Sequence, residues 1–131
     1  MTPELTTLAA SIVLGLIHIV LSSHAASLQR GYRWAASARD EPVPPLLGIA
    51  GRLDRASRNF LETFPFFAAA VLMAHLMERH DWMTLWGVQL YFWGRILYLG
   101  LYALGVPLAR SLAWNIATGG IVLILIRLLW E

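Results

Sequence analysis

Two groups of polar side chains in this apolar chain have the types and spacings that ligand chemistry needs. At 100° per residue, the first group covers about 80° of one helix face; it comprises Arg52, Arg55, Asn59 and Glu62, with Arg58 at its border. The second covers about 60° of another helix; it comprises Tyr91, Arg95, Tyr98 and Tyr102. Guanidinium groups hold carboxylates through charge-assisted hydrogen bonds, and tyrosine hydroxyls can donate to a carboxylate or a thiolate. The two groups therefore predict a site for an anion with more than one carboxylate.

The remaining side chains narrow the kind of anion. Glu62 offers an acceptor for an ammonium group, and Asn59 is suited to recognising an amide. A ligand with two carboxylates, an amine, amide bonds and a thiol fits this set, and glutathione is such a molecule. The chain has no cysteine, which excludes a cysteine nucleophile and a thiolate metal site.

The elements that must carry these residues are long apolar segments. The 131-residue chain is 58% hydrophobic and only 14% charged, whereas soluble domains carry about 25% charge. Four segments approach the ~20 residues that a helix needs to cross a membrane, and none alternates as a strand would; they are residues 5–26, 59–77, 82–104 and 111–130. We therefore predict an all-α, integral membrane four-helix bundle forming a single domain over residues 1–131. The net charge of +2 does not argue for nucleic acid.

The arginines predict the orientation of these segments. Seven lie in the connections at one end of the bundle: Arg30, Arg33, Arg39, Arg52, Arg55, Arg58 and Arg110. Arg79 is the one arginine in the connection at the other end. Because positively charged loops stay in the cytoplasm, both termini should be non-cytoplasmic. The arginines also follow the first apolar stretch rather than precede it, which is the reverse of a secretory signal.

This topology brings three segments together at the cytoplasmic end. The segment 59–77 begins there with Asn59 and Glu62, and 82–104 ends there with Tyr98 and Tyr102. The segment 111–130 opens at the same end beside Arg110 and Ser111. Residues 40–45 contain three prolines and cannot be helix interior, but the chain should be helical again from about Gly51.

Several of these residues also have structural interpretations. Arg52 is expected to belong to a solvated helix end that binds anionic lipid headgroups. Arg95 either binds a ligand or is neutralised by Glu62 across the bundle, and the sequence favours neither. Tyr91 is expected to pack rather than bind. Asn59 and Glu62, which we expect to be buried, favour a functional site because a four-helix bundle can be built without either.

The four histidines do not predict a metal site. They fall in two pairs, His18 with His24 and His75 with His80, and neither pair has the i, i+4 spacing of helical ligands. Packing or interfacial roles are expected instead.

Two motifs resemble signatures of the MAPEG superfamily, the membrane-associated proteins in eicosanoid and glutathione metabolism. The first is R-x-x-R-A-x-x-N-x-x-E from Arg52 to Glu62, followed by Pro65 and Phe66. The second is R-x-x-Y-x-x-x-Y from Arg95 to Tyr102, followed by a short turn and Arg110-Ser111. The resemblance covers essentially the whole chain.

The resemblance implies a homotrimer that binds glutathione between subunits near the cytosolic face. The residues implied to hold glutathione are Arg55, Arg58, Asn59, Glu62, Arg95, Tyr98 and Tyr102. Arg110 would stabilise the thiolate, with Ser111 beside it, since an adjacent cation lowers a thiol's pKa. The implied activity is a glutathione-dependent transferase or peroxidase acting on lipophilic electrophiles from the bilayer. The short termini lead us to expect a bacterial inner membrane, with membrane lipids as further partners.

Two other functions stay open at this stage. A non-catalytic member of the same family would bind a lipid or a partner protein. A small multidrug transporter would need a carboxylate within the first segment, where only Glu4 at the edge is available. The F-E-R-V box of the leukotriene-forming branch is absent, so that role is not supported. Arg30 lies outside both motifs and has no assigned role. Arg52 opens the first motif, but the motif assigns it no role.

Overall fold

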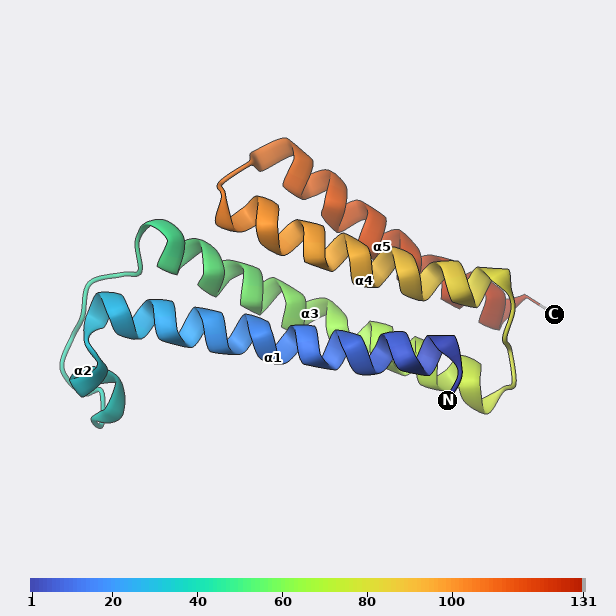
Figure 1. The fold of residues 1–131 in the computed structure, drawn as a ribbon, viewed down its shortest axis with the longest axis horizontal. Coiled ribbons are helices and arrows are strands. Elements are labelled where there is room, and N and C mark those ends of the chain that lie inside the picture. Colours follow the sequence, from blue (N-terminus) through green and yellow to red (C-terminus); the bar gives the residue numbers. More distant parts are fainter. Residues whose placement is uncertain (131) are drawn as a thin grey trace.

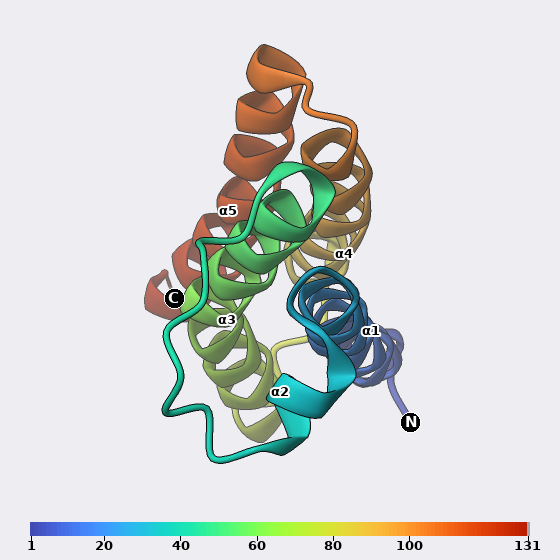
Figure 2. The ribbon, with the colours of Figure 1, turned by 90° about the vertical axis from the view of Figure 1, so that its left-hand side faces the viewer.

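The computed structural model describes residues 1–130, and within them the only regular elements are helices (Figure 1). They are α1 (Pro3–Arg30), α2 (Tyr32–Ala36), α3 (Gly48–Leu76), α4 (Trp82–Ala103) and α5 (Pro107–Leu129). The four long helices lie side by side and alternate in direction, so the N-terminus and the end of α5 lie at the same end (Figures 1 and 2). The all-α prediction is confirmed.

Three of the described helices are long and apolar enough to cross a membrane: α1, α3 and α5. Helix α4 has 22 residues, which span about 33 Å at 1.5 Å per residue, but it does not reach the same apolarity. Its tryptophans and tyrosines, together with Gln89 and Arg95, lower its mean hydropathy. The predicted segment 82–104 matches α4 in length and position, and its crossing of the membrane stays a prediction.

The helix ends differ from the predicted segments for local reasons. Helix α1 is longer at both ends, with Thr2 accepting a hydrogen bond from the Leu5 amide as its N-cap. Helix α5 begins at Pro107 rather than residue 111, because the first turn of a helix tolerates a proline that lacks an N–H. The segment 40–45 is non-helical, as its prolines predict, but the short helix α2 before it was not expected.

Small residues allow α4 and α5 to pack closely. A Cβ atom added to Gly87 would lie 2.8 Å from the carbonyl oxygen of Gly120, and one added to Gly94 would lie 3.0 Å from the Cβ of Ala117. Contacts this close leave no room for side chains, which is how helices associate in lipid without a hydrophobic driving force. The helix pair that carries part of the site is therefore held by close packing at small residues.

Aromatic rings fill the interface between α3 and α4. Tyr91 is fully buried and stacks on Phe67 with ring centroids 3.9 Å apart. Its hydroxyl forms a 3.1 Å hydrogen bond with the hydroxyl of Thr63. The packing expected for Tyr91 is confirmed within residues 1–130.

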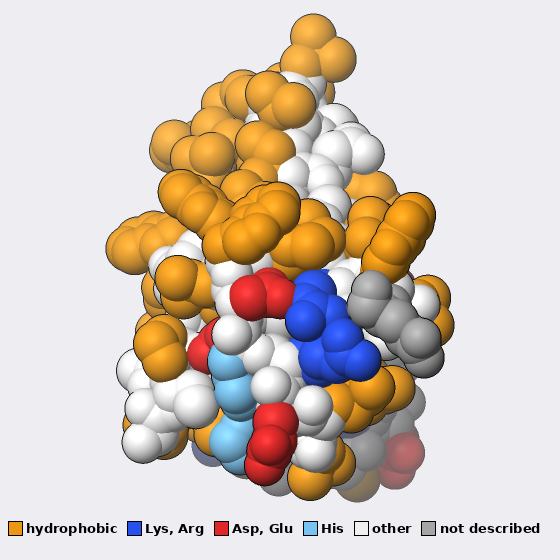
Figure 3. All heavy atoms as spheres, turned by 90° about the vertical axis from the view of Figure 1, so that its right-hand side faces the viewer, with side chains coloured by type: hydrophobic (Ala, Val, Ile, Leu, Met, Phe, Trp, Pro, Cys, Tyr) orange, Lys and Arg blue, Asp and Glu red, His pale blue; other side chains and the backbone are white. Residues whose placement is uncertain are grey.

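Polar contacts close the end of the molecule that holds the N-terminus, where acidic, basic and histidine side chains gather (Figure 3). Glu4 accepts a 2.8 Å hydrogen bond from Thr84, and Arg127 pairs with Asp81. Burial raises the pKa of the Asp81 carboxyl, but hydrogen bonds from Arg127 and from two backbone amides outweigh it and hold that pKa below its usual range. This pair fixes the α3–α4 connection against the end of α5.

Candidate functional site

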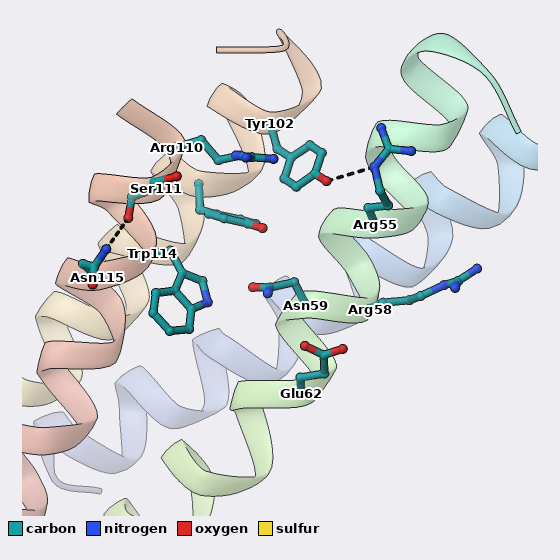
Figure 4. A pocket seen from close by; sticks show the side chains of 10 residues that line it. Arg55, Arg58, Asn59, Glu62, Tyr102, Arg110, Ser111, Trp114 and Asn115 are labelled. Carbon is teal, nitrogen blue, oxygen red and sulfur yellow. Dashed lines mark hydrogen bonds between the residues drawn. The ribbon is translucent and has the colours of Figure 1, made fainter. Parts of the chain in front are cut away.

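A cavity of about 490 Å³ opens near the other end of the molecule, between α3, α4 and α5 (Figure 4). Helix α3 contributes Arg55, Arg58, Asn59 and Glu62, helix α4 contributes Tyr98 and Tyr102, and helix α5 contributes Arg110, Ser111, Trp114 and Asn115. Every residue that the family resemblance implied for the site lines this cavity except Arg95, and Arg52 and Tyr91 of the two polar groups do not line it. The grouping follows from alternating helix directions, which place the start of α3, the end of α4 and the start of α5 at one level.

Tyr102 organises two of the arginines at the upper edge of the cavity. Arg55 Nε donates a 2.9 Å hydrogen bond to the Tyr102 hydroxyl (Figure 4). The guanidinium carbon of Arg110 lies 4.5 Å from the centroid of the same ring. A cation over an aromatic face is attracted by the negative face of the ring. Tyr102 therefore holds two guanidinium groups from different helices on one side of the cavity.

Arg58 and Glu62 lie on the outer rim. Arg58 points away from the other lining residues (Figure 4), is 72% exposed and forms a 2.7 Å ion pair with Asp54. Glu62 is exposed, so the expectation that it is buried with Asn59 was wrong; Asn59 itself is half-buried. The helical period correctly placed Asn59 and Glu62 on one face of α3. That face lines an open cavity and not a closed core.

Arg95 lies behind the cavity wall with none of its side chain exposed. Its Nη1 donates a 2.8 Å hydrogen bond to Asn59 Oδ1, and its guanidinium carbon lies 4.4 Å from the centroid of the Tyr98 ring. Within residues 1–130 Arg95 forms no direct ion pair with Glu62, so Asn59 and not Glu62 is its direct polar partner. Its Nε and Nη2 have no hydrogen-bond partner in the described chain.

The contact with Arg95 fixes what Asn59 can offer. An arginine only donates hydrogen bonds, so the Asn59 atom that faces it must be the amide oxygen. The Asn59 Nδ2 group, with two N–H donors, is then left for the cavity that Asn59 lines. Asn59 is therefore set to donate to a carbonyl or carboxylate oxygen of a ligand.

Sequence reasoning missed two lining residues, Trp114 and Asn115. Trp114 Nε1 is buried and has no hydrogen-bond partner within residues 1–130, although indole N–H groups usually find one. Asn115 Nδ2 donates a 2.9 Å hydrogen bond to the Ser111 carbonyl oxygen. Both lie one helical turn after Arg110 and Ser111, so the i, i+3 and i, i+4 spacing could have found them.

Ser111 and Arg52 are held by backbone contacts near the cavity. The Ser111 hydroxyl donates a 3.3 Å hydrogen bond to the Pro107 carbonyl oxygen. Arg52 Nε donates a 2.9 Å hydrogen bond to the Ala103 carbonyl oxygen. Arg52 thus ties α3 to the end of α4, where an arginine satisfies a carbonyl that the helix leaves free.

The described residues contain no group of three or more histidine, cysteine, aspartate or glutamate side chains that could hold a metal ion. His18 is buried and stacks on Phe60, with ring centroids 4.8 Å apart. The rings of His75 and His80 lie 5.4 Å apart. These contacts agree with the packing and interfacial roles expected for the histidines.

Comparison with protein families gives one decisive match. The model of the MAPEG family matches residues 7–130, which is almost the whole chain. The chain belongs to the MAPEG family. No match was found among curated proteins or among solved structures. Together with the three apolar helices, MAPEG membership makes this an integral membrane protein, and the family suggests a role connected with glutathione or eicosanoids.

Proposed function

We propose that this MAPEG protein is a glutathione-dependent transferase or peroxidase that acts on lipophilic electrophiles. The observation that carries the proposal is the cavity between α3, α4 and α5, where guanidinium, carboxylate, amide, phenol and indole groups converge. Its volume of about 490 Å³ falls in the range of about 300–1,000 Å³ usual for small-molecule sites.

The lining groups match the functional groups of glutathione one by one. Arg55 and Arg110, both in contact with Tyr102, supply guanidinium groups for the carboxylates. Glu62 on the rim supplies a carboxylate for the ammonium group. Asn59 Nδ2 and the unpaired Trp114 Nε1 supply N–H donors for the peptide carbonyl oxygens. The Asn59 Nδ2 and Trp114 Nε1 donors thereby gain partners that the chain does not give them.

Arg110 is the proposed catalytic residue, with Ser111 beside it. Glutathione supplies a thiol, whose thiolate displaces a leaving group such as halide from an electrophilic carbon as a C–S bond forms. The Arg110 guanidinium favours the thiolate by its charge, and the thiol proton passes to solvent. The lipophilic substrate is proposed to reach the cavity from the bilayer.

The membrane arrangement proposed with this function follows the arginines. Helix α4 crosses the membrane with α1, α3 and α5, and both termini are non-cytoplasmic. The cavity then faces the cytoplasm, where soluble glutathione is available, and three copies associate as a homotrimer. A bacterial inner membrane is the proposed location.

Conjugation of a generic aryl halide by the detergent-purified protein tests the proposal. We expect glutathione-dependent turnover, lost in Arg110→Ala while glutathione affinity stays within a few-fold of wild type. Glu62→Ala should mainly weaken glutathione binding, because it removes a contact to the ligand and not the thiolate partner. Arg79→Ala, at the opposite end, is the matched control and should behave as wild type.

Two results would contradict the catalytic assignment. Full activity in Arg110→Ala would mean that another group stabilises the thiolate. Glutathione binding without any turnover would instead indicate a non-catalytic MAPEG protein that binds a lipid or a partner protein.

A further inference from the structure

A smaller cavity, of about 260 Å³, adjoins the candidate site on the side of the α4–α5 connection. The two cavities share Arg55, Tyr102 and Arg110. The smaller one is lined in addition by Arg52, Gly105, Val106 and Pro107. Arg52 precedes Asn59 by seven residues on α3, which is about 10 Å of helix, so this cavity lies between the candidate site and the end of the bundle. We call it the outer cavity.

Contacts with the end of α4 hold Arg52 in the outer cavity. Its Nε donates a 2.9 Å hydrogen bond to the Ala103 carbonyl oxygen. Gly105 has a φ of +76°, which a glycine adopts without strain, and a Cβ atom added to it would lie 3.8 Å from Arg52 Cδ. Arg52 is half-buried, and within residues 1–130 its Nη1 and Nη2 groups make no hydrogen bond. Its charge is therefore fixed in place while two of its donor groups remain available.

The charges around the outer cavity are all of one sign. Three arginines line it, and no aspartate or glutamate does. Within residues 1–130 none of the three forms an ion pair, and Asp54, which neighbours Arg55 in the sequence, pairs with Arg58 at 2.7 Å. Guanidinium groups stay charged at physiological pH, and a cleft lined by one sign of charge concentrates ions of the opposite sign. The outer cavity therefore attracts anions from the solution at this end.

Arg52 takes no part in the proposed binding of glutathione, although it lies next to two residues that do. Arg55 and Arg110, assigned to the glutathione carboxylates, line both cavities, with Tyr102 between them (Figure 4). A carboxylate in the outer cavity can therefore move from Arg52 to either of them and stay close to a guanidinium group throughout. Because glutathione carries two carboxylates against one ammonium group, this path favours it over a neutral thiol.

We propose that the outer cavity is the entrance through which glutathione reaches the candidate site, and that Arg52 captures one of its carboxylates. This inference rests on the proposed glutathione function. Capture by charge raises the rate of association and leaves dissociation nearly unchanged, because Arg52 does not contact the bound ligand. Two other roles of Arg52 predict different results. A purely structural bond to Ala103 would not respond to salt, and a lipid headgroup at Arg52 would act only in the presence of lipid.

Stopped-flow mixing of the detergent-purified protein with glutathione, without added lipid, measures both rates. Trp114 lines the candidate site, so tryptophan fluorescence reports binding. At about 20 mM salt, where charges act over about 20 Å, Arg52→Gln should lower the association rate constant about fivefold. Its dissociation rate constant should stay within about twofold of wild type. At about 500 mM salt the difference in association should disappear.

Arg33→Gln is the matched control for the loss of one charge. Arg33 is an exposed arginine of α2 that lines neither cavity. Its replacement should change the association rate constant by less than about twofold at any salt concentration.

Val106 allows the same test without removing Arg52. It is exposed, lines the outer cavity, and is the N-cap of α5 without a side-chain cap hydrogen bond, a position that favours aspartate and asparagine. Val106→Asp should slow the association of glutathione about as much as Arg52→Gln, whereas the neutral Val106→Asn should behave as wild type. Glutathione diethyl ester, which lacks both carboxylates, should associate no more slowly with Arg52→Gln than with wild type.

Three results would overturn the entrance and leave the proposed function standing. They are an unchanged association rate in Arg52→Gln at low salt, a slower rate that persists at high salt, and equal slowing of the diethyl ester. If Arg52→Gln fails to fold, equal association rates in Val106→Asp and Val106→Asn would overturn the entrance as well. An absence of glutathione binding to the folded wild-type protein would overturn both the entrance and the proposed function.

Discussion

The pairing of Asn59 with Arg95 allows the structural and the binding role of Asn59 to be separated by two substitutions. Asn59→Leu removes the only hydrogen bond that the fully buried Arg95 makes within the described residues. Leaving a buried charged group without its partner costs about 3 kcal/mol. Asn59→Asp instead keeps an oxygen facing Arg95 and adds an opposite charge. The free energy of unfolding should therefore fall in Asn59→Leu and stay within about 1 kcal/mol of wild type in Asn59→Asp.

Asn59→Asp should weaken ligand binding even though it keeps the stability of the protein close to wild type. The substitution replaces the Nδ2 donors that remain for the cavity with a carboxylate oxygen, which repels a carboxylate and cannot donate to a carbonyl group. Loss of one such hydrogen bond is equivalent to about a tenfold weaker affinity. Thermal unfolding followed by circular dichroism and calorimetric titration with glutathione measure the two effects. A stable Asn59→Asp protein with wild-type glutathione affinity would refute the assignment of Asn59 Nδ2 as a ligand donor.

Three further predictions test the cavity wall, the helix packing and the closed end. Trp114→Phe keeps the aromatic packing but removes the unpaired indole N–H, so glutathione affinity should fall several-fold at unchanged stability; equal affinity would exclude that donor. Gly87→Val places atoms where the Gly120 carbonyl lies, so unfolding in detergent should shift to clearly lower temperature, whereas a wild-type transition would contradict the close packing. Asp81 has a lowered pKa in the folded protein, so the stability it gains from Arg127 is present above its unfolded pKa of about 3.9 and is lost as the pH falls through the lower folded value. Asp81→Asn should therefore be less stable than wild type at pH 7, a difference that should shrink to nothing in strong acid.

The sequence predicted the helices and the level at which the site residues meet. Apolar length and the absence of alternation identified each of the four long helices, though not the short α2, and alternating direction brought the polar ends of three helices together. The face containing Asn59 and Glu62 followed from the 100° period alone, and both residues line the cavity. These features depend on local pattern and on topology, which a single sequence contains.

The sequence did not predict which hydrogen-bond or ion-pair partner each side chain has. For Arg95 the sequence left a ligand and Glu62 as alternative partners, whereas in the structure the buried Arg95 donates to the neutral Asn59 and Glu62 is exposed. Periodicity assigns a residue to a face, and it does not say which neighbour lies closest across an interface. The sequence did not single out Trp114, because nothing in a sequence shows that an indole N–H will have no partner in the folded chain, as that of Trp114 has none within residues 1–130.

Calorimetric titration of the detergent-purified protein with glutathione tests the central claim most directly. We expect saturable binding of glutathione that is weakened in Glu62→Ala and in Asn59→Asp but unchanged in Arg79→Ala. An absence of binding heat at any glutathione concentration up to the millimolar range, with the protein folded, would contradict the assignment of the cavity between α3, α4 and α5 as a glutathione site.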